Sequence, residues 1–123
     1  MLKGSCACGK VHFKVTGQPR GATACHCGQC RKMAGIAWAS ADVPEDQLQI
    51  EGPVHWLSLT DAARRGICPD CGAFLFWHGT GDHHVSFALG AIDGPTGVKI
   101  AQHIFVADKG DYYGLADGVV QKP

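Results

Sequence analysis

The chain has 123 residues, and its 11 lysines and arginines balance 11 aspartates and glutamates, so its formal net charge is zero. A neutral chain without basic clusters lacks the electrostatic footprint of a protein that binds nucleic acid or an anionic membrane, so we expect neither partner. Its length and its 46% of hydrophobic residues predict one globular domain over residues 1–123.

The longest continuous apolar run, residues 73–77, is far shorter than a signal-peptide core or a membrane-spanning helix. The chain nevertheless contains seven cysteines. In a protein without an export signal these indicate a reducing compartment, where thiols are more often metal ligands than disulfides. We therefore expect a cytoplasmic protein.

Short segments with alternating or β-rich composition recur along the chain and predict strands. In chain order they cover residues 11–15, 36–41, 47–51, 55–59, 73–77, 84–89 and 99–106. One short helix is predicted over 29–34, where good helix formers follow the second cysteine cluster, and an irregular tail is predicted from Tyr112 onward. The expected fold is mainly β, with little helix.

The cysteines form three short clusters: Cys6 with Cys8, then Cys25 with Cys27 and Cys30, then Cys68 with Cys71. Residues i and i+2 of an extended segment point to the same side, and a C-x-x-C turn brings two sulfurs together, so each cluster suits a metal ion. A structural zinc site has four ligands, whereas a catalytic site keeps three and an open position. Seven cysteines therefore predict two zinc ions, one of each kind.

Two partitions of the cysteines fit the spacing. In the preferred one, the first and third clusters form a four-thiolate site, and Cys25, Cys27 and Cys30 form an open three-thiolate site. In the other, Cys27 and Cys30 join Cys68 and Cys71 as a zinc ribbon. A thioredoxin-type dithiol at Cys68 and Cys71 is a third interpretation, but no βαβ pattern surrounds it.

Other side chains near the three-cysteine cluster are candidates for roles in catalysis. His26 points away from its neighbours if the segment is extended, so we expect it to orient the site or face the substrate rather than bind metal. Arg31 and Lys32 follow the last cysteine, and we expect them to offset negative charge and receive a substrate carboxylate. His26 or His103 is the candidate proton carrier.

Aromatic and histidine side chains elsewhere provide further candidates. Trp38, Phe76 and Trp77 are candidates for the pocket wall, although a place in the core is the favoured role for each of them singly. If His78 or His103 completed the second metal site, no position would remain for a substrate. Such a closed site would favour a zinc-stapled binding module that is not an enzyme.

The motifs around the cysteines resemble those of the glutathione-dependent formaldehyde-activating enzyme family, which includes centromere protein V. The resemblance rests on Gly4-Ser5-Cys6-Ala7-Cys8-Gly9, on Cys25-His26-Cys27-Gly28-Gln29-Cys30 and on Arg65-Gly66-Ile67-Cys68-Pro69-Asp70-Cys71-Gly72. Weaker echoes are Gly90-Ala91-Ile92-Asp93, His103-Ile104-Phe105-Val106 and Asp117-Gly118-Val119-Val120. The match therefore runs through nearly the whole chain.

The resemblance implies a β-tent, a fold of twisted antiparallel sheets with two zinc ions, and it assigns the cysteines as in the preferred partition. It also implies a carbon–sulfur lyase-type activity, the condensation of glutathione with formaldehyde to S-(hydroxymethyl)glutathione. The chain is short for that enzyme, which leaves the true thiol and aldehyde open. A carrier of the adduct is the alternative function.

Overall fold

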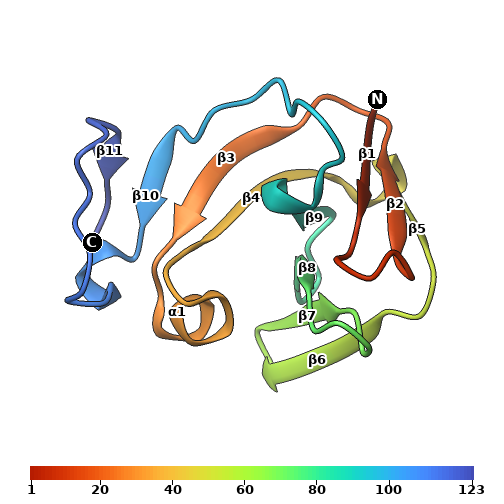
Figure 1. Cartoon of the computed structure of the whole chain (residues 1–123), viewed down its shortest axis with the longest axis horizontal. Coiled ribbons are helices and arrows are strands. Elements are labelled where there is room, and N and C mark those ends of the chain that lie inside the picture. Colours follow the sequence, from red (N-terminus) through yellow and green to blue (C-terminus); the bar gives the residue numbers. More distant parts are fainter.

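A computed structural model describes all residues of the chain, 1–123 (Figure 1). It contains one α-helix, three single-turn 3₁₀ helices and eleven strands. In chain order the elements are β1 (Leu2–Ser5), β2 (His12–Val15), β3 (Arg20–Cys25), α1 (Gly28–Ala34), β4 (Trp38–Pro44), β5 (Leu48–Glu51), β6 (His55–Thr60), β7 (Ala63–Ile67), β8 (Phe74–Gly79), β9 (His84–Ala88), β10 (Gln102–Ile104) and β11 (Val120–Gln121). None of its helices has the length and apolar character needed to cross a membrane.

The strands form two sheets. The smaller has the order β1-β2-β5 and the larger the order β11-β10-β3-β4-β9-β8-β7-β6. Both are antiparallel except around β10, which pairs parallel with β3 and with β11. In Figure 1 the large sheet curves from β11 at one end of the molecule, past α1, to β6, and the small sheet lies at the opposite end from β11.

The main core fills the space between the two sheets. Phe13 of β2 packs edge-on against Phe76 of β8, with ring centres 5.1 Å apart, and lies 6.1 Å from Phe87 of β9. Alternation places Val43 of β4 and Val85 of β9 on the same side, in the same apolar cluster. One face of the large sheet is therefore committed to the core, which leaves the other face for a site.

All seven predicted strands lie on observed ones, and the predicted helix is α1. The expectation over 99–106 is too long, because only Gln102–Ile104 is a strand and the left-handed backbone of Phe105 ends it. The tail is irregular as predicted except at β11. Strands β1, β3 and β7 were not predicted, because glycine, alanine and charged residues give them little β signal, and β11 was not predicted because it has only two residues.

Candidate metal centres

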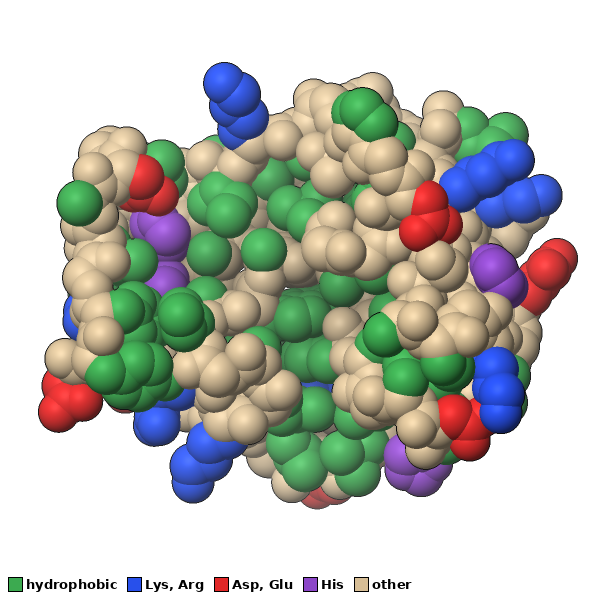
Figure 2. All heavy atoms as spheres, viewed as in Figure 1, with side chains coloured by type: hydrophobic (Ala, Val, Ile, Leu, Met, Phe, Trp, Pro, Cys, Tyr) green, Lys and Arg blue, Asp and Glu red, His purple; other side chains and the backbone are tan.

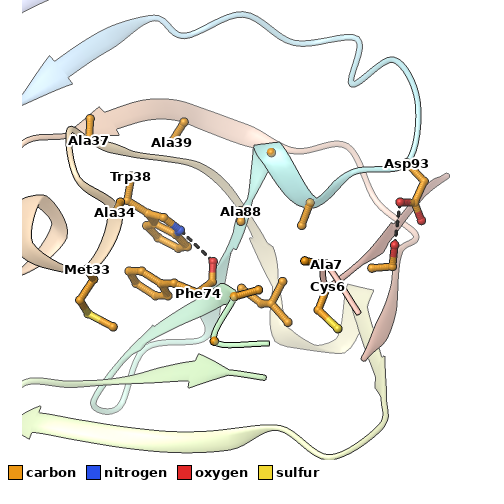
Figure 3. Close-up of a pocket in the computed structure, with 16 residues that line it drawn as sticks. Cys6, Ala7, Met33, Ala34, Ala37, Trp38, Ala39, Phe74, Ala88 and Asp93 are labelled. Carbon is orange, nitrogen blue, oxygen red and sulfur yellow. Dashed lines mark hydrogen bonds between the residues drawn. The ribbon is translucent and has the colours of Figure 1, made fainter. Parts of the chain in front are cut away.

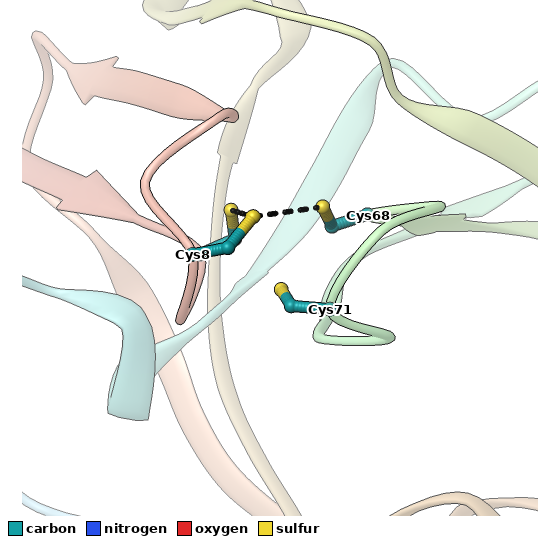
Figure 4. A group of neighbouring side chains, drawn as sticks. Cys8, Cys68 and Cys71 are labelled. Atoms are coloured by element: carbon teal, nitrogen blue, oxygen red, sulfur yellow. Dashed lines mark hydrogen bonds between the residues drawn. The ribbon is translucent and has the colours of Figure 1, made fainter.

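Two groups of cysteines bring their sulfur atoms together, and neither group includes a histidine. In the first, Cys6, Cys8, Cys68 and Cys71 have sulfur atoms that all lie within 4.8 Å of one another (Figure 4). The Sγ of Cys8 is 3.6 Å from that of Cys6 and 3.7 Å from that of Cys68. Zinc–sulfur bonds of about 2.3 Å place the corners of a tetrahedron about 3.8 Å apart, so this group has the dimensions of a zinc site.

Two tight turns build this four-sulfur group. The first follows β1, where the backbone N–H of Val11 donates to the Sγ of Cys6 over 3.2 Å. The second joins β7 to β8, where Gly72, with φ of +78°, donates its N–H to the carbonyl of Cys68 over 2.9 Å. A positive φ at this position favours glycine, and the turn bends the chain so that both sulfurs of the C-x-x-C motif face one point.

Backbone N–H groups also favour the thiolate form of Cys71, which is half-buried in the four-sulfur group. The N–H groups near Ala73 and Cys8 lower the pKa of Cys71 from 9.0 to about 6. The thiolate is the form of cysteine that binds metals. Cys71 therefore needs no strong base to become a ligand.

The second group consists of Cys25 at the end of β3, Cys27 at the N-cap of α1, and Cys30 within that helix. The N–H of Cys30 donates to the Sγ of Cys27 over 3.4 Å. The hydrogen bond from the Cys30 thiol is the main influence that lowers the pKa of Cys25 to about 6, and the same contact raises the pKa of Cys30. These three sulfurs thus share negative charge, which a divalent cation would stabilise.

These three sulfurs line a cavity of about 340 Å³ on the face of the large sheet that points away from the core. Its floor comes from alternate residues of neighbouring strands, which the register places on one side: Thr23 and Cys25, Trp38, Ser40 and Asp42, Ser86, Trp77, Ala63 and Arg65. Gln29, Ile104 and Phe105 also line the cavity. The cavity has the size of a small-molecule site.

Arg65 of β7 is the cation of this cavity. The residue is 3% exposed, its Nη2 donates to the Oε1 of Gln29, and its Nε has no hydrogen-bond partner. Three thiolates that share one divalent ion carry one net negative charge, which a single guanidinium balances. The donor set and this incompletely partnered guanidinium therefore fit a zinc ion at Cys25, Cys27 and Cys30.

A chain of four side chains ties the three-cysteine group to the C-terminal segment. His26, 1% exposed, lies with its Nε2 2.9 Å from the Nδ1 of His103 and its Nδ1 2.7 Å from the hydroxyl of Tyr113. The Nε2 of His103 is 2.8 Å from the Oδ2 of Asp117, and this contact lowers the pKa of Asp117. With both rings neutral, His103 donates to Asp117, His26 donates to His103, and Tyr113 donates to His26.

The protonation of His26 follows from its surroundings. Burial is the main cause that lowers the pKa of His26, and repulsion from His103 in its protonated form and from Lys109 lowers it further. A neutral His26 suits the chain of donors just described. It does not line the cavity of the three sulfurs, so its contact with that site runs through the backbone between Cys25 and Cys27.

A second, more open hollow lies on the other side of Trp38. It has a volume of about 680 Å³ and is lined mostly by small apolar side chains, with Cys6 at one end and Met33 at the other (Figure 3). Trp38 stacks on Phe74 with ring centres 4.0 Å apart and donates its indole N–H to the Phe74 carbonyl over 3.0 Å. Figure 2 draws the same side of the molecule as Figure 1 and shows a hollow with apolar side chains near its middle.

The other predicted site residues lie at varied distances from the three sulfurs. Arg31 donates its Nε to the carbonyl of Asp108 over 3.2 Å, and neither it nor the exposed Lys32 lines the cavity. Trp38 and Trp77 do line it. Phe76 takes the core role instead, because this residue is completely buried between the sheets.

The structure also answers the two alternatives for the metal ligands. The sulfurs of Cys27 and Cys30 do not group with those of Cys68 and Cys71, so the zinc-ribbon partition is not formed. His78 contacts the carbonyl of Asp82, and neither it nor His103 joins the three-sulfur group. The position beside the three sulfurs therefore has no fourth cysteine, histidine or carboxylate.

Several residues of the site were not predicted from the sequence. Arg65 was noted within a motif, but not as a cavity residue, because β7 was not predicted. Tyr113 and Asp117 lie in the tail, whose irregular sequence carries no periodic signal. Phe105 lines the cavity and has a left-handed backbone, with φ of +53°, which no sequence pattern predicts for a phenylalanine.

The fold and the two sulfur groups define a small, mainly β protein with two candidate thiolate metal centres. The chain belongs to the glutathione-dependent formaldehyde-activating enzyme family, whose model matches residues 1–108. A Halomonas elongata protein named after the same family is 31% identical over 86 residues, which are 62% of this chain and 55% of the relative. The match therefore spans about half the length of that relative.

A solved structure supports the fold. The crystal structure of a Rhodobacter sphaeroides protein aligns with a TM-score of 0.62 over 98% of this chain and 99% of that chain, at 20% sequence identity. At that identity the likeness concerns the fold alone.

Proposed function

We propose that the chain is a zinc-dependent enzyme that adds a thiol to a small aldehyde, with glutathione and formaldehyde as the pair and S-(hydroxymethyl)glutathione as the product. The reaction is formally that of a carbon–sulfur lyase in reverse. The observation that carries the proposal is the group of Cys25, Cys27 and Cys30, which lines a cavity and has no fourth protein ligand. The family to which the chain belongs supports the choice of substrates.

A zinc ion bound there would supply a position at which a substrate thiol loses its proton and is held as a thiolate. In the addition, the thiol sulfur forms a bond to the carbonyl carbon. The π electron pair moves to the carbonyl oxygen, which takes up a proton equivalent to the one that the sulfur lost. Trp38 and Trp77 provide apolar walls that limit the entry of water around the reacting atoms.

The four-sulfur group has a separate role in this proposal. It joins the turn after β1 to the turn between β7 and β8, two segments about 60 residues apart in sequence. A structural zinc ion contributes on the order of 10 kcal/mol to folding, as much as the whole stability of a small domain. We therefore propose zinc at both groups, with the ion of the four-sulfur group as a determinant of the fold. We also propose the cytoplasm as the location, because this reducing compartment keeps the cysteines from forming disulfides.

The first test is the zinc content of protein purified under reducing conditions without chelator, with free thiols counted alongside. We expect a ratio near two zinc ions per chain, and near one in Cys27→Ser.

The second test is the rate of exchange between formaldehyde and its glutathione adduct, measured by NMR against the uncatalysed reaction. Acceleration by the native protein, lost in Cys27→Ser, supports the enzyme. Full zinc content with adduct binding but no acceleration would instead identify an adduct carrier.

A further inference from the structure

Two adjacent arginines of β7 lie in opposite environments. Arg64 is exposed, with its guanidinium 4.2 Å from the centre of the Trp56 ring. Arg65 is 3% exposed and lines the cavity of the three sulfurs beside its cross-strand partner Trp77. The strand thus places one cation in solvent and the next inside the cavity.

The protein provides no carboxylate for the inner cation. The ion pairs of the chain join Lys10 with Asp70 and Arg20 with Asp42, and the remaining three involve histidines. Asp42 also lines the cavity, but its Oδ1 accepts from the Nε of Arg20 over 2.7 Å. Arg65 therefore has only the neutral Oε1 of Gln29 as a polar partner, and its Nε has none.

A buried guanidinium without a counter-charge is unfavourable, because burial removes its hydration. The three-cysteine group is the other source of negative charge in this cavity, and Arg65 helps to lower the pKa of Cys25. Once those thiolates share a divalent ion, one net negative charge remains, and Arg65 neutralises it. An anionic ligand then enters a site that is close to neutral, instead of one that repels it.

We propose that Arg65 makes this cavity selective for negatively charged ligands that bind beside the three sulfurs. The proposal deepens the proposed function, because it identifies the ligand class as a small thiol that binds as its anion. Long-range attraction and the guanidinium N–H groups both favour the anion over a neutral ligand of similar size. A guanidinium has N–H donors and no acceptor, so Arg65 stabilises charge and transfers no proton.

The main test compares two ligands of cobalt-loaded protein, whose visible absorption reports ligand binding. Imidazole binds as a neutral molecule and 2-mercaptoethanol as a thiolate. We expect Arg65→Gln to weaken 2-mercaptoethanol at least about ten-fold relative to imidazole. Arg64→Gln is the matched control, and its ratio should stay within about two-fold of the native one. If the ratio of thiol to imidazole affinity is unchanged in Arg65→Gln, with cobalt bound at both groups, this inference is overturned and the proposed function is not.

A second variant leaves Arg65 in place and remains informative if Arg65→Gln does not fold. Gln29→Glu puts a carboxylate where an amide oxygen already accepts from Arg65. Its new charge neutralises the guanidinium from within the protein, so the ratio of thiol to imidazole affinity should fall in the same direction. A ratio that stays at the native value in Gln29→Glu contradicts the role of Arg65.

A metal-free measurement separates this inference from the proposed function. Iodoacetate and iodoacetamide have similar size but differ in charge, and both alkylate Cys25 by forming a sulfur–carbon bond and releasing iodide. In protein whose three-cysteine group is stripped of metal, Arg65→Gln should lower the rate with iodoacetate at least about five-fold relative to iodoacetamide. Equal loss for both reagents overturns the inference. A shifted ratio in a protein without exchange activity supports the inference while the proposed function fails.

Discussion

His103 holds His26 from the side opposite Tyr113, with 2.9 Å between the Nδ1 of His103 and the Nε2 of His26. His26 lies between Cys25 and Cys27, and its backbone N–H donates to the carbonyl of Ile104 over 3.0 Å. Side chain and backbone thus bind the same cysteine loop to β10. The C-terminal segment, through Asp117 and Tyr113, therefore helps to fix the geometry of the three sulfurs.

The first prediction concerns this contact. His103→Ala leaves the buried Nε2 of His26 without a partner, which costs about 1–3 kcal/mol in the free energy of unfolding. It also loosens the loop that carries Cys25 and Cys27, so metal should leave the three-cysteine group faster while the four-sulfur group is unaffected. Urea unfolding and the kinetics of zinc transfer to a chromophoric chelator measure the two effects.

The matched control is His12→Ala, since His12 is exposed on β2. It should change neither the free energy of unfolding nor the rate of zinc transfer. If both variants release zinc at the native rate, His103 does not position the loop.

The second prediction separates the two sulfur groups. Cys68 is completely buried and joins the turn after β1 to β7 and β8, so Cys68→Ser should give insoluble or molten protein. Cys27 lies at the N-cap of α1, and Cys27→Ser should leave a folded protein with one zinc fewer. Near-UV circular dichroism and elemental analysis distinguish these results. Equal behaviour of the two variants would contradict the division into a structural and a reactive group.

Much of this architecture could be predicted from the sequence. The alternation around Phe13 and Val15 and the turn glycines give the strands of the core, and the spacing of the cysteines gives three compact clusters. The clusters can be predicted from spacing because the local backbone of a C-x-C or C-x-x-C motif brings its two sulfurs together. The preferred partition, by contrast, depends on contacts between the turns, which single-chain periodicity does not encode.

What sequence reasoning missed lies where two distant segments meet. Arg65 and Gln29 are neighbours only because β7 and α1 face one cavity, and nothing in the sequence near either residue indicates this contact. Asp117 and His103 likewise meet through the parallel pair of β10 and β11. Parallel pairing of short strands leaves little pattern, because each contributes two or three residues.

The third prediction concerns the pH dependence of the reactive thiol. Contact with the Cys30 thiol, aided by the N–H of Cys27 and the charge of Arg65, lowers the pKa of Cys25 from 9.0 to about 6. In protein with a metal-free three-cysteine group, alkylation of Cys25 by iodoacetamide should therefore rise with pH to about 7 and then level off. Mass spectrometry of the labelled peptide across pH 5–10 gives the curve.

The variant Cys30→Ala removes the main cause of this shift. Its labelling curve at Cys25 should move toward that of an ordinary thiol and continue to rise to about pH 10. A native curve that already rises to pH 9 would show that Cys25 is not the thiolate of the group.

The last prediction concerns Phe105, whose backbone is left-handed with φ of +53° and whose side chain is half-exposed at the cavity. A bulky residue in this conformation costs about 1–2 kcal/mol, whereas asparagine adopts it more easily. Phe105→Asn should therefore have a free energy of unfolding about 0.5–1 kcal/mol higher than Phe105→Ala.

Both variants lose the ring at the cavity, so both should raise the KM for the thiol by a similar factor. Urea unfolding and exchange kinetics on the pair measure the two effects. Equal stability of the two variants would show that the positive φ is not maintained, and an unchanged KM would remove Phe105 from the substrate site.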